Sequence, residues 1–316
     1  MKDEIDELNF DQSPPLGEDQ GEQSFLARKV VVGKDGKHSF LFWLIIPVVM
    51  IWLSIGYITG FVRDKPIWSR GENVLGETTA VVPYFQQHGS FTENLDQAFI
   101  TFWFDDAWLS QYLEAYPTLK SNNFPGVIAV FVNGIETSNY MNWAQLRILQ
   151  KDGWEITDHS LAHDCSMQSW NKEKVFNEYR TSKFILWKND LSADIFVTPC
   201  GVDSEIMREE AEKTFMGYRT VDPGLNNAKN VNVYNFKVKN VDDKTTASEM
   251  RSWVDQAKES KSWLIFVFHK VGEKNAEPGG DEFNTSKENF QNIVDYVKAS
   301  NVKVVIPRQI MTSQKP

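Results

Sequence analysis

Two of the chain's five histidines stand four residues apart in "WEITDHSLAHDC", residues 154–165. "HSLAH" begins where the strand-like run "WEIT" stops, so a short turn would bring the imidazoles of His159 and His163 to one side. Alone, such a pair is at least as typical of two surface or core histidines. As metal ligands they would need at least one more ligand, often a carboxylate, and an open position for water.

Candidates for that third ligand end another strand-like run, "AFITFWFDD" at residues 98–106. Neighbouring residues of a strand point in different directions, so Asp105 and Asp106 cannot act as a matched pair on one group. One of them can bind the metal while the other faces a substrate. A further histidine, His269, lies near the end of "SWLIFVFHKV", a late apolar run.

Strand-like runs alternate with helical stretches through the second part of the chain, which favours a parallel sheet. The helical stretches include 171–190 and 285–300, where apolar residues recur at helical spacing. Seven or eight such units predict an α/β fold, a distorted (β/α) barrel of about seven strands, with a doubly wound sheet as the alternative. In either fold, functional residues gather at the carboxyl ends of the strands. The predicted strands are 98–106, 126–134, 154–160, 193–201, 215–222, 230–238, 262–271 and 302–307.

The chain divides into four predicted parts. Residues 1–38 are acidic without apolar periodicity, which is typical of a disordered tail. Residues 39–62 carry no charge and are long enough for one transmembrane helix; a cleaved signal peptide would have a shorter apolar run. A linker (63–75) and the folded domain (76–312) follow.

Basic residues on both sides of the apolar segment favour a cytoplasmic N-terminus only weakly. The expected topology, a single-pass membrane protein whose folded domain lies outside the cytoplasm, therefore depends partly on the function of that domain. The net charge of -10 and the pI near 5.1 argue against nucleic acid as a partner, because phosphate contacts need clustered Lys and Arg.

Motifs in the second part of the chain resemble the polysaccharide deacetylases of the NodB-homology type, carbohydrate esterase family 4. Their T-F-D-D-G motif is similar to "FWFDDA" (102–107), and their H-[ST]-x-x-H motif to "HSLAH". Their third motif, in the form ending P-[YF]-G, resembles "TPCG" (198–201), and their late-strand histidine resembles His269. Order and spacing agree over residues 98–310.

The resemblance implies roles for the matching residues. Asp105 would be the general base and His269 the general acid, and Asp106, His159 and His163 would bind one divalent metal. Zinc is the expected ion, with cobalt, nickel and iron as alternatives. The implied activity is hydrolysis of the amide bonds of N-acetyl groups on an extracellular N-acetylated polysaccharide, such as peptidoglycan or poly-N-acetylglucosamine.

Three departures from the family pattern bear on this expectation. Ala107 replaces a glycine, so the turn must avoid a positive φ or accept strain. The third motif lacks the arginine that helps to orient the base, and Arg219 is the candidate substitute. Asp222 loosely resembles the aspartate that would accept a hydrogen bond from His269 and raise its pKa; otherwise it starts a turn.

Several further residues are candidates for contacts with the substrate or with an oxyanion. The loop of Pro199, Cys200 and Gly201 supplies backbone N–H groups, from Cys200 and Gly201 because proline has none, and Trp108 offers a flat ring to a sugar. Cys200 and Cys165 are expected to be small buried apolar groups or a disulfide pair. Ligands of a structural zinc site with histidine are the alternative.

Two rival functions remain from the sequence. A non-catalytic relative that binds polysaccharide is favoured by the missing arginine, although every candidate metal ligand is retained. A glycoside hydrolase needs two carboxylates about 5 to 9.5 Å apart, which adjacent aspartates do not obviously provide.

Overall fold

Seven parallel strands close into a barrel in the computed structural model, which describes residues 88–91, 96–227, 229–272 and 283–314. Around the barrel the strand order is β2-β3-β4-β5-β6-β8-β9, and β9 pairs with β2 along six residues to close it. This confirms the predicted barrel over the doubly wound sheet. The barrel strands are β2 (Phe99–Phe104), β3 (Val127–Val130), β4 (Glu155–Asp158), β5 (Ala193–Val197), β6 (Gly217–Pro223), β8 (Phe236–Asn240) and β9 (Ser262–Phe268).

Short strands lie beside the barrel. β12 (Lys303–Val304) pairs in parallel with the start of β2, and β7 (Asn226–Asn227) pairs antiparallel with β9. Two small sheets join β1 (His88–Phe91) to β13 (Met311–Gln314) and β10 (Lys270–Val271) to β11 (Asn284–Thr285). The run 302–307 is thus not an eighth barrel strand, because only two of its residues pair. The strand expected over 230–238 begins only at Phe236.

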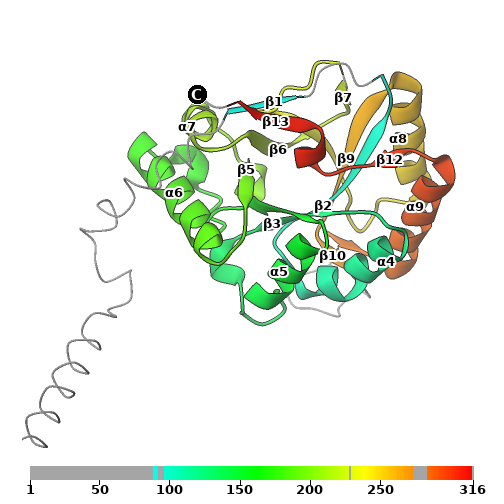
Figure 1. The fold of residues 1–316 in the computed structure, drawn as a ribbon, viewed down its shortest axis with the longest axis horizontal. Helices are drawn as coiled ribbons and strands as arrows, with labels where there is room; N and C mark the ends of the chain where they lie inside the picture. The colour runs from blue at the N-terminus through cyan, green and yellow to red at the C-terminus, as the bar shows by residue number, and fades with distance from the viewer. Residues whose placement is uncertain (1–87, 92–95, 228, 273–282, 315–316) are drawn as a thin grey trace, which may run out of the picture. The chain divides into compact units, whose positions relative to one another are not determined.

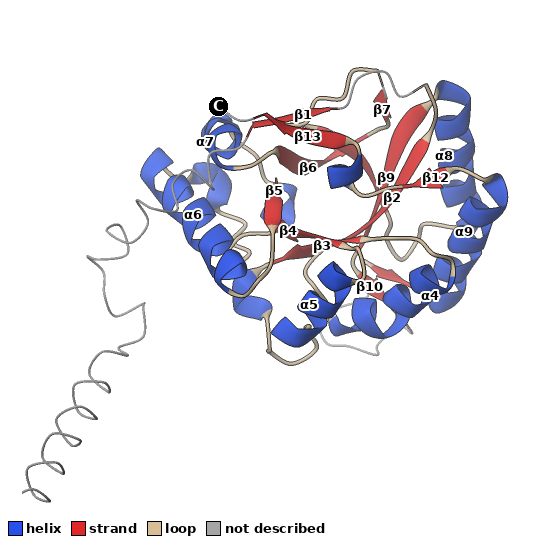
Figure 2. Cartoon of the chain, viewed as in Figure 1, coloured by secondary structure: helices blue, strands red, loops and turns tan. Residues whose placement is uncertain are grey.

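Helices surround the strands, as Figures 1 and 2 show. The predicted helices 171–190 and 285–300 are confirmed as α6 and α9, and their expected apolar residues, such as Val175 and Phe290, are buried. Helical turns of three residues occur in the loops: η4 (Val132–Gly134), η5 (Met167–Ser169), η6 (Pro199–Gly201) and η7 (Pro307–Gln309). The main helices are α5 (Trp143–Lys151), α6 (Lys172–Lys188), α7 (Glu205–Thr214), α8 (Ala247–Ser260) and α9 (Lys287–Ser300), with a π-helical turn η3 (Gln111–Ala115) leading into α4 (Tyr116–Ser121).

Alternation along the strands separates the packing inside the barrel from the packing under the helices. In β2, Phe99 and Trp103 belong to a cluster that includes no residue of helices α4 to α9 and fills the barrel interior. Ile100 and Phe102, which point the other way, pack with helix residues such as Val294. Inward-facing residues that continue past the strand ends therefore meet at the rim of the barrel.

Among the described residues, no helix has the length and apolar character needed to cross a bilayer. The predicted tail (1–38), transmembrane helix (39–62) and linker (63–75) all lie outside the described residues.

Candidate metal centre

Three predicted ligands from two loops meet at the carboxyl end of the barrel. Asp106 follows β2, and His159 and His163 follow β4. The Oδ1 atom of Asp106 lies 3.4 Å from Nε2 of His159 and 3.5 Å from Nε2 of His163. The structure thus brings together residues that are more than fifty positions apart in the sequence.

These distances fit a shared metal ion. A tetrahedral ion with bonds of about 2.0–2.1 Å to nitrogen and oxygen separates neighbouring ligand atoms by about 3.3–3.4 Å. The three side chains supply two imidazoles and one carboxylate, and His163 is partly exposed, so water can reach the site. The group is therefore suited to a catalytic ion with an open position.

A backbone carbonyl fixes the orientation of the His159 ring. Nδ1 of His159 lies 2.9 Å from the carbonyl oxygen of Val197, the last residue of β5. Because a carbonyl only accepts, Nδ1 carries the hydrogen and donates it, which leaves the lone pair of Nε2 facing Asp106 and His163. Histidine ligands of metals typically have such a partner.

The loop "HSLAH" is shaped by polar residues that sequence reasoning missed. The Asp158 carboxylate accepts hydrogen bonds from the Ser160 N–H (2.9 Å) and from the Ser182 hydroxyl of α6 (2.6 Å). The Ser160 hydroxyl in turn accepts from the His163 N–H at 2.9 Å. The spacing of Asp158 and Ser160 is a typical aspartate turn signal, so this part was visible in the sequence.

A tryptophan holds the third ligand. The indole N–H of Trp108 donates to Oδ2 of Asp106 at 2.9 Å, which leaves Oδ1 directed at the histidines. Tyr140 stacks on the Trp108 ring at 4.3 Å, and the Lys270 ammonium lies 4.4 Å from the ring centroid. These contacts support a role in positioning Asp106 more directly than the predicted stacking on a sugar.

Charges at the site favour an ionised Asp106. Burial raises the pKa of Asp106, but the hydrogen bond and charge of His159 and the charges of the other histidines lower that pKa well below its ordinary value. Burial lowers the pKa of His159, yet Asp106 and Asp105 outweigh it and raise that pKa. For His163, burial and the nearby His159 charge lower the pKa, which favours a neutral ring.

The second carboxylate of the acidic pair lies next to the metal ligands but points elsewhere. Asp105 is buried, and its Oδ1 accepts a hydrogen bond from the buried guanidinium of Arg219. Its Oδ2 lies 4.0 Å from Nε2 of His269. Arg219 therefore occupies the position of the substitute arginine that the sequence suggested. Asp105 and His269 together flank one side of the site.

A buried glutamine ties these two residues together. The Gln111 amide donates to the backbone carbonyl of Asp105 at 2.5 Å and to that of His269 at 2.8 Å. Gln111 lies in the π-helical turn after β2, and nothing in its sequence position signalled this role.

Asp222 does not reach His269, so the prediction that it orients the general acid is wrong. Its exposed carboxylate accepts from the Lys237 ammonium at 2.8 Å. Asp222 lies beyond the buried part of β6, where the side chains face solvent. Nδ1 of His269 is buried and has no hydrogen-bond partner among the described residues.

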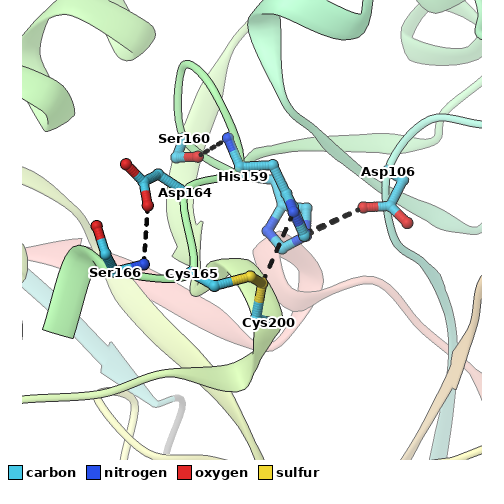
Figure 3. Close-up of a disulfide and its surroundings, with 8 residues drawn as sticks. Asp106, His159, Ser160, Asp164, Cys165, Ser166 and Cys200 are labelled. Atoms are coloured by element: carbon cyan, nitrogen blue, oxygen red, sulfur yellow. Dashed lines mark hydrogen bonds and ion pairs between the residues drawn. A yellow bond between two sulfur atoms is a disulfide. The ribbon is translucent and has the colours of Figure 1, made fainter.

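The "TPCG" loop forms the turn η6 (Pro199–Gly201), and its Cys200 is bonded to Cys165. Both cysteines are exposed, so the expectation of small buried groups is wrong and the disulfide alternative is confirmed. Figure 3 shows this disulfide, with His159 and Asp106 in the same view. The Gly201 N–H donates to Thr198 only at 3.4 Å. Whether the loop N–H groups hold an oxyanion stays a prediction.

Strained backbone is concentrated around the site. Five non-glycine residues here have a positive φ, the left-handed region that such residues avoid. Ala107 has a φ of 61°, so the turn accepts the strain that the sequence analysis named as one outcome. Strain of this kind is typical of functional sites. The five residues are Asp106, Ala107, Ser160, His163 and Cys200.

Comparison with known proteins finds a matching family. Residues 92–221 match the family model described as "Polysaccharide deacetylase". No curated protein matches the chain.

The chain is also similar to solved structures. The Bc1960 peptidoglycan N-acetylglucosamine deacetylase is 17% identical, with a TM-score of 0.52, over 71% of this chain and 93% of that one. A family 4 acetyl xylan esterase from Clostridium thermocellum, solved with a cobalt ion, is 14% identical (TM-score 0.49) over 67% and 89% of the two chains. A pseudoenzyme of the same family from Bacillus anthracis is 12% identical (TM-score 0.49) over 70% and 67%.

Proposed function

The chain carries a domain of the polysaccharide deacetylase family, and from this premise we propose that it removes N-acetyl groups from an amino-sugar polysaccharide by metal-dependent hydrolysis. One observation carries the proposal: a carboxylate and two imidazoles converge within 3.5 Å beside a separate carboxylate and a third histidine. Such an arrangement provides a metal site and an acid–base pair on the same rim.

Asp106, His159 and His163 would hold the metal ion. An ion bound there supplies a Lewis acid for the acetamide oxygen and a water whose pKa falls from ~15.7 towards ~7. Zinc fits the ligand set, and cobalt, nickel and iron accept the same donors. The Val197 carbonyl and the Trp108 indole keep the His159 and Asp106 ligand atoms pointed at this position.

Proton transfer falls to the other two residues. Asp105, which Arg219 holds in place, accepts the proton of the attacking water. His269 donates a proton to the amine nitrogen as the carbon–nitrogen bond breaks, because a free amide anion is a poor leaving group. The products are acetate and the free amino sugar.

The test is acetate release by the purified full chain in detergent from N-acetylglucosamine oligomers and from peptidoglycan. We expect release that a chelator abolishes and that added zinc or cobalt restores, and the preferred polymer identifies the substrate. No release from any polymer by folded, metal-loaded protein would contradict the proposal and favour the alternative, a non-catalytic polysaccharide-binding relative.

We also propose that the domain lies outside the cytoplasm, anchored through residues 39–62 with the N-terminus inside. The Cys165–Cys200 disulfide supports this location, because disulfides persist mainly in oxidising compartments. A membrane-impermeant protease added to intact cells should digest the C-terminal domain, and protection of that domain would reverse the proposed topology.

A further inference from the structure

The disulfide touches one of the candidate metal ligands. Sγ of Cys200 lies 3.9 Å from Nδ1 of His163, while Nε2 of the same ring lies 3.5 Å from Asp106. The imidazole of His163 therefore stands between two groups of ligand atoms, one of carboxylate and imidazole and one of sulfur.

The sulfur group has the dimensions of a metal site. Ligand atoms of His163, Cys165 and Cys200 all lie within 4.8 Å of one another. A tetrahedral ion with bonds of about 2.3 Å to sulfur and about 2.0 Å to nitrogen separates nitrogen from sulfur by about 3.5 Å and two sulfurs by about 3.8 Å. Once the disulfide is open, the Cα atoms of the cysteines, 5.5 Å apart, allow this separation.

We propose that reduction of the Cys165–Cys200 disulfide creates a second metal site, formed by both thiolates and Nδ1 of His163, which takes a thiophilic divalent ion. The disulfide would thus decide to which site His163 belongs. The existence of this site does not depend on the proposed deacetylase function; only its effect on activity rests on that function.

One ring cannot serve both sites at once. A neutral imidazole has one nitrogen with a free lone pair, because the other carries the hydrogen. When Nε2 faces the ion at Asp106 and His159, Nδ1 is protonated; when Nδ1 binds at the thiolates, Nε2 is protonated. Filling the sulfur site therefore leaves the first site with two protein ligands.

The chemistry balances with a dithiol reductant, either a thioredoxin-type protein or dithiothreitol. The reductant gives two electrons and two protons to the sulfur–sulfur bond and becomes a disulfide, and Cys165 and Cys200 become thiols. Binding of a divalent ion then releases the two thiol protons. Both cysteines are exposed, so a dithiol can reach them.

The experiment titrates cobalt(II) into the full chain in detergent, before and after reduction and removal of the reductant. We expect a sulfur-to-cobalt charge-transfer absorption band only in the reduced protein, saturating at one ion per chain. The double variant Cys165→Ser, Cys200→Ser should lack the band under both conditions.

Two results would overturn the proposal. One is a reduced chain without the band, although alkylation and mass measurement count two free thiols. The other is a reduced His163→Ala variant that binds cobalt at the thiols as tightly as the unsubstituted chain, where we expect binding weaker by about tenfold or more.

Activity provides a separate measurement. Reduction followed by one equivalent of cadmium should lower acetate release, and removal of cadmium with reoxidation should restore it. A chain that releases no acetate even when oxidised and zinc-loaded contradicts the proposed function, while the absorption band still decides the second site.

Discussion

Two buried carboxylates face arginines at opposite ends of the same barrel. At the carboxyl end, Asp105 pairs with Arg219, and both side chains are almost completely buried. At the amino end, Glu155 begins β4 and accepts a hydrogen bond from the backbone N–H of Arg308 at 2.9 Å. Its Oε1 lies 3.9 Å from Nε of Arg308, whose side chain is 41% exposed. Both carboxylates lie at ends of barrel strands, but among the described side chains only Asp105 of the two has a histidine within 4.0 Å.

The neighbours make the difference. Around Asp105 stand His269 and the ligand group of Asp106, His159 and His163. The distant Arg308 guanidinium compensates Glu155 only in part, and burial raises the pKa of Glu155 to about 7. A buried carboxylate with a perturbed pKa is thus not by itself a sign of catalysis; convergence with other reactive groups is the better criterion.

The sharpest test of this contrast compares Asp105→Asn with Glu155→Gln. Asparagine cannot accept the proton of the attacking water, so we expect acetate release to fall by about 10²–10⁴-fold. Glu155→Gln should retain activity, because Glu155 lies at the other end of the barrel.

Folding must be measured alongside, because Asp105→Asn also leaves the buried Arg219 without its countercharge, which costs several kcal/mol in similar pairs, about 3–5. Circular dichroism melts separate the two effects. A well-folded Asp105→Asn variant with full activity would contradict the role of Asp105 as the general base and would leave Asp105, like Glu155, as a structural carboxylate.

Glu155 should instead govern the pH dependence of stability. Its pKa is raised from an ordinary 4.5 to about 7, so the folded chain binds the proton more tightly than the unfolded chain. Stability should therefore fall as the pH rises from about 4.5 to about 7, by up to about 3 kcal/mol from this group. Glu155→Gln mimics the protonated form, so its free energy of unfolding relative to that of the unsubstituted chain should increase from pH 5 to pH 8.

Urea unfolding at these two pH values measures the gain. If the two proteins differ by the same free energy of unfolding at both pH values, the pKa of Glu155 is not raised, and the contrast drawn from that pKa is wrong.

Trp108→Phe tests whether metal binding by the predicted ligands depends on the side chains around them. Phenylalanine keeps a ring against Tyr140 but lacks the N–H that binds Asp106, so metal affinity should fall by about 10–100-fold. Competition with a chromogenic chelator measures the affinity. Trp187→Phe on α6, where the ring packs beside Phe184, is the matched control and should bind metal normally.

Ala107→Gly should have the smallest effect. Glycine relieves the positive φ of Ala107, worth about 1 kcal/mol, but removes a buried methyl group worth about 0.8 kcal/mol. We expect the free energy of unfolding to change by less than about 1 kcal/mol. A gain of more than about 1 kcal/mol in the free energy of unfolding, measured by thermal unfolding, would show that the backbone strain at Ala107 costs more than its positive φ alone explains.

Much of the site was predictable, because its residues follow recognisable strands. Asp106, His159 and His163 were found from strand ends and motif spacing, and the structure brings them together. The prediction for Asp222 was wrong although Asp222 lies on the same strand as Arg219. Only the structure shows that the last residues of β6 are exposed, so that the Asp222 side chain faces solvent. Gln111 gave no signal, since its two partners are backbone carbonyls 158 and six residues away.

The sequence by itself determined the alternating strands and helices and the order of the motifs, because burial patterns and turn signals are local properties of the chain. Only the tertiary structure decided which distant residues meet. Closure of β9 on β2 sets Asp105 beside His269, and the path of β6 brings in Arg219, 114 residues from Asp105. The disulfide was decided in the same way, because the loops that follow β4 and β5 lie on one rim.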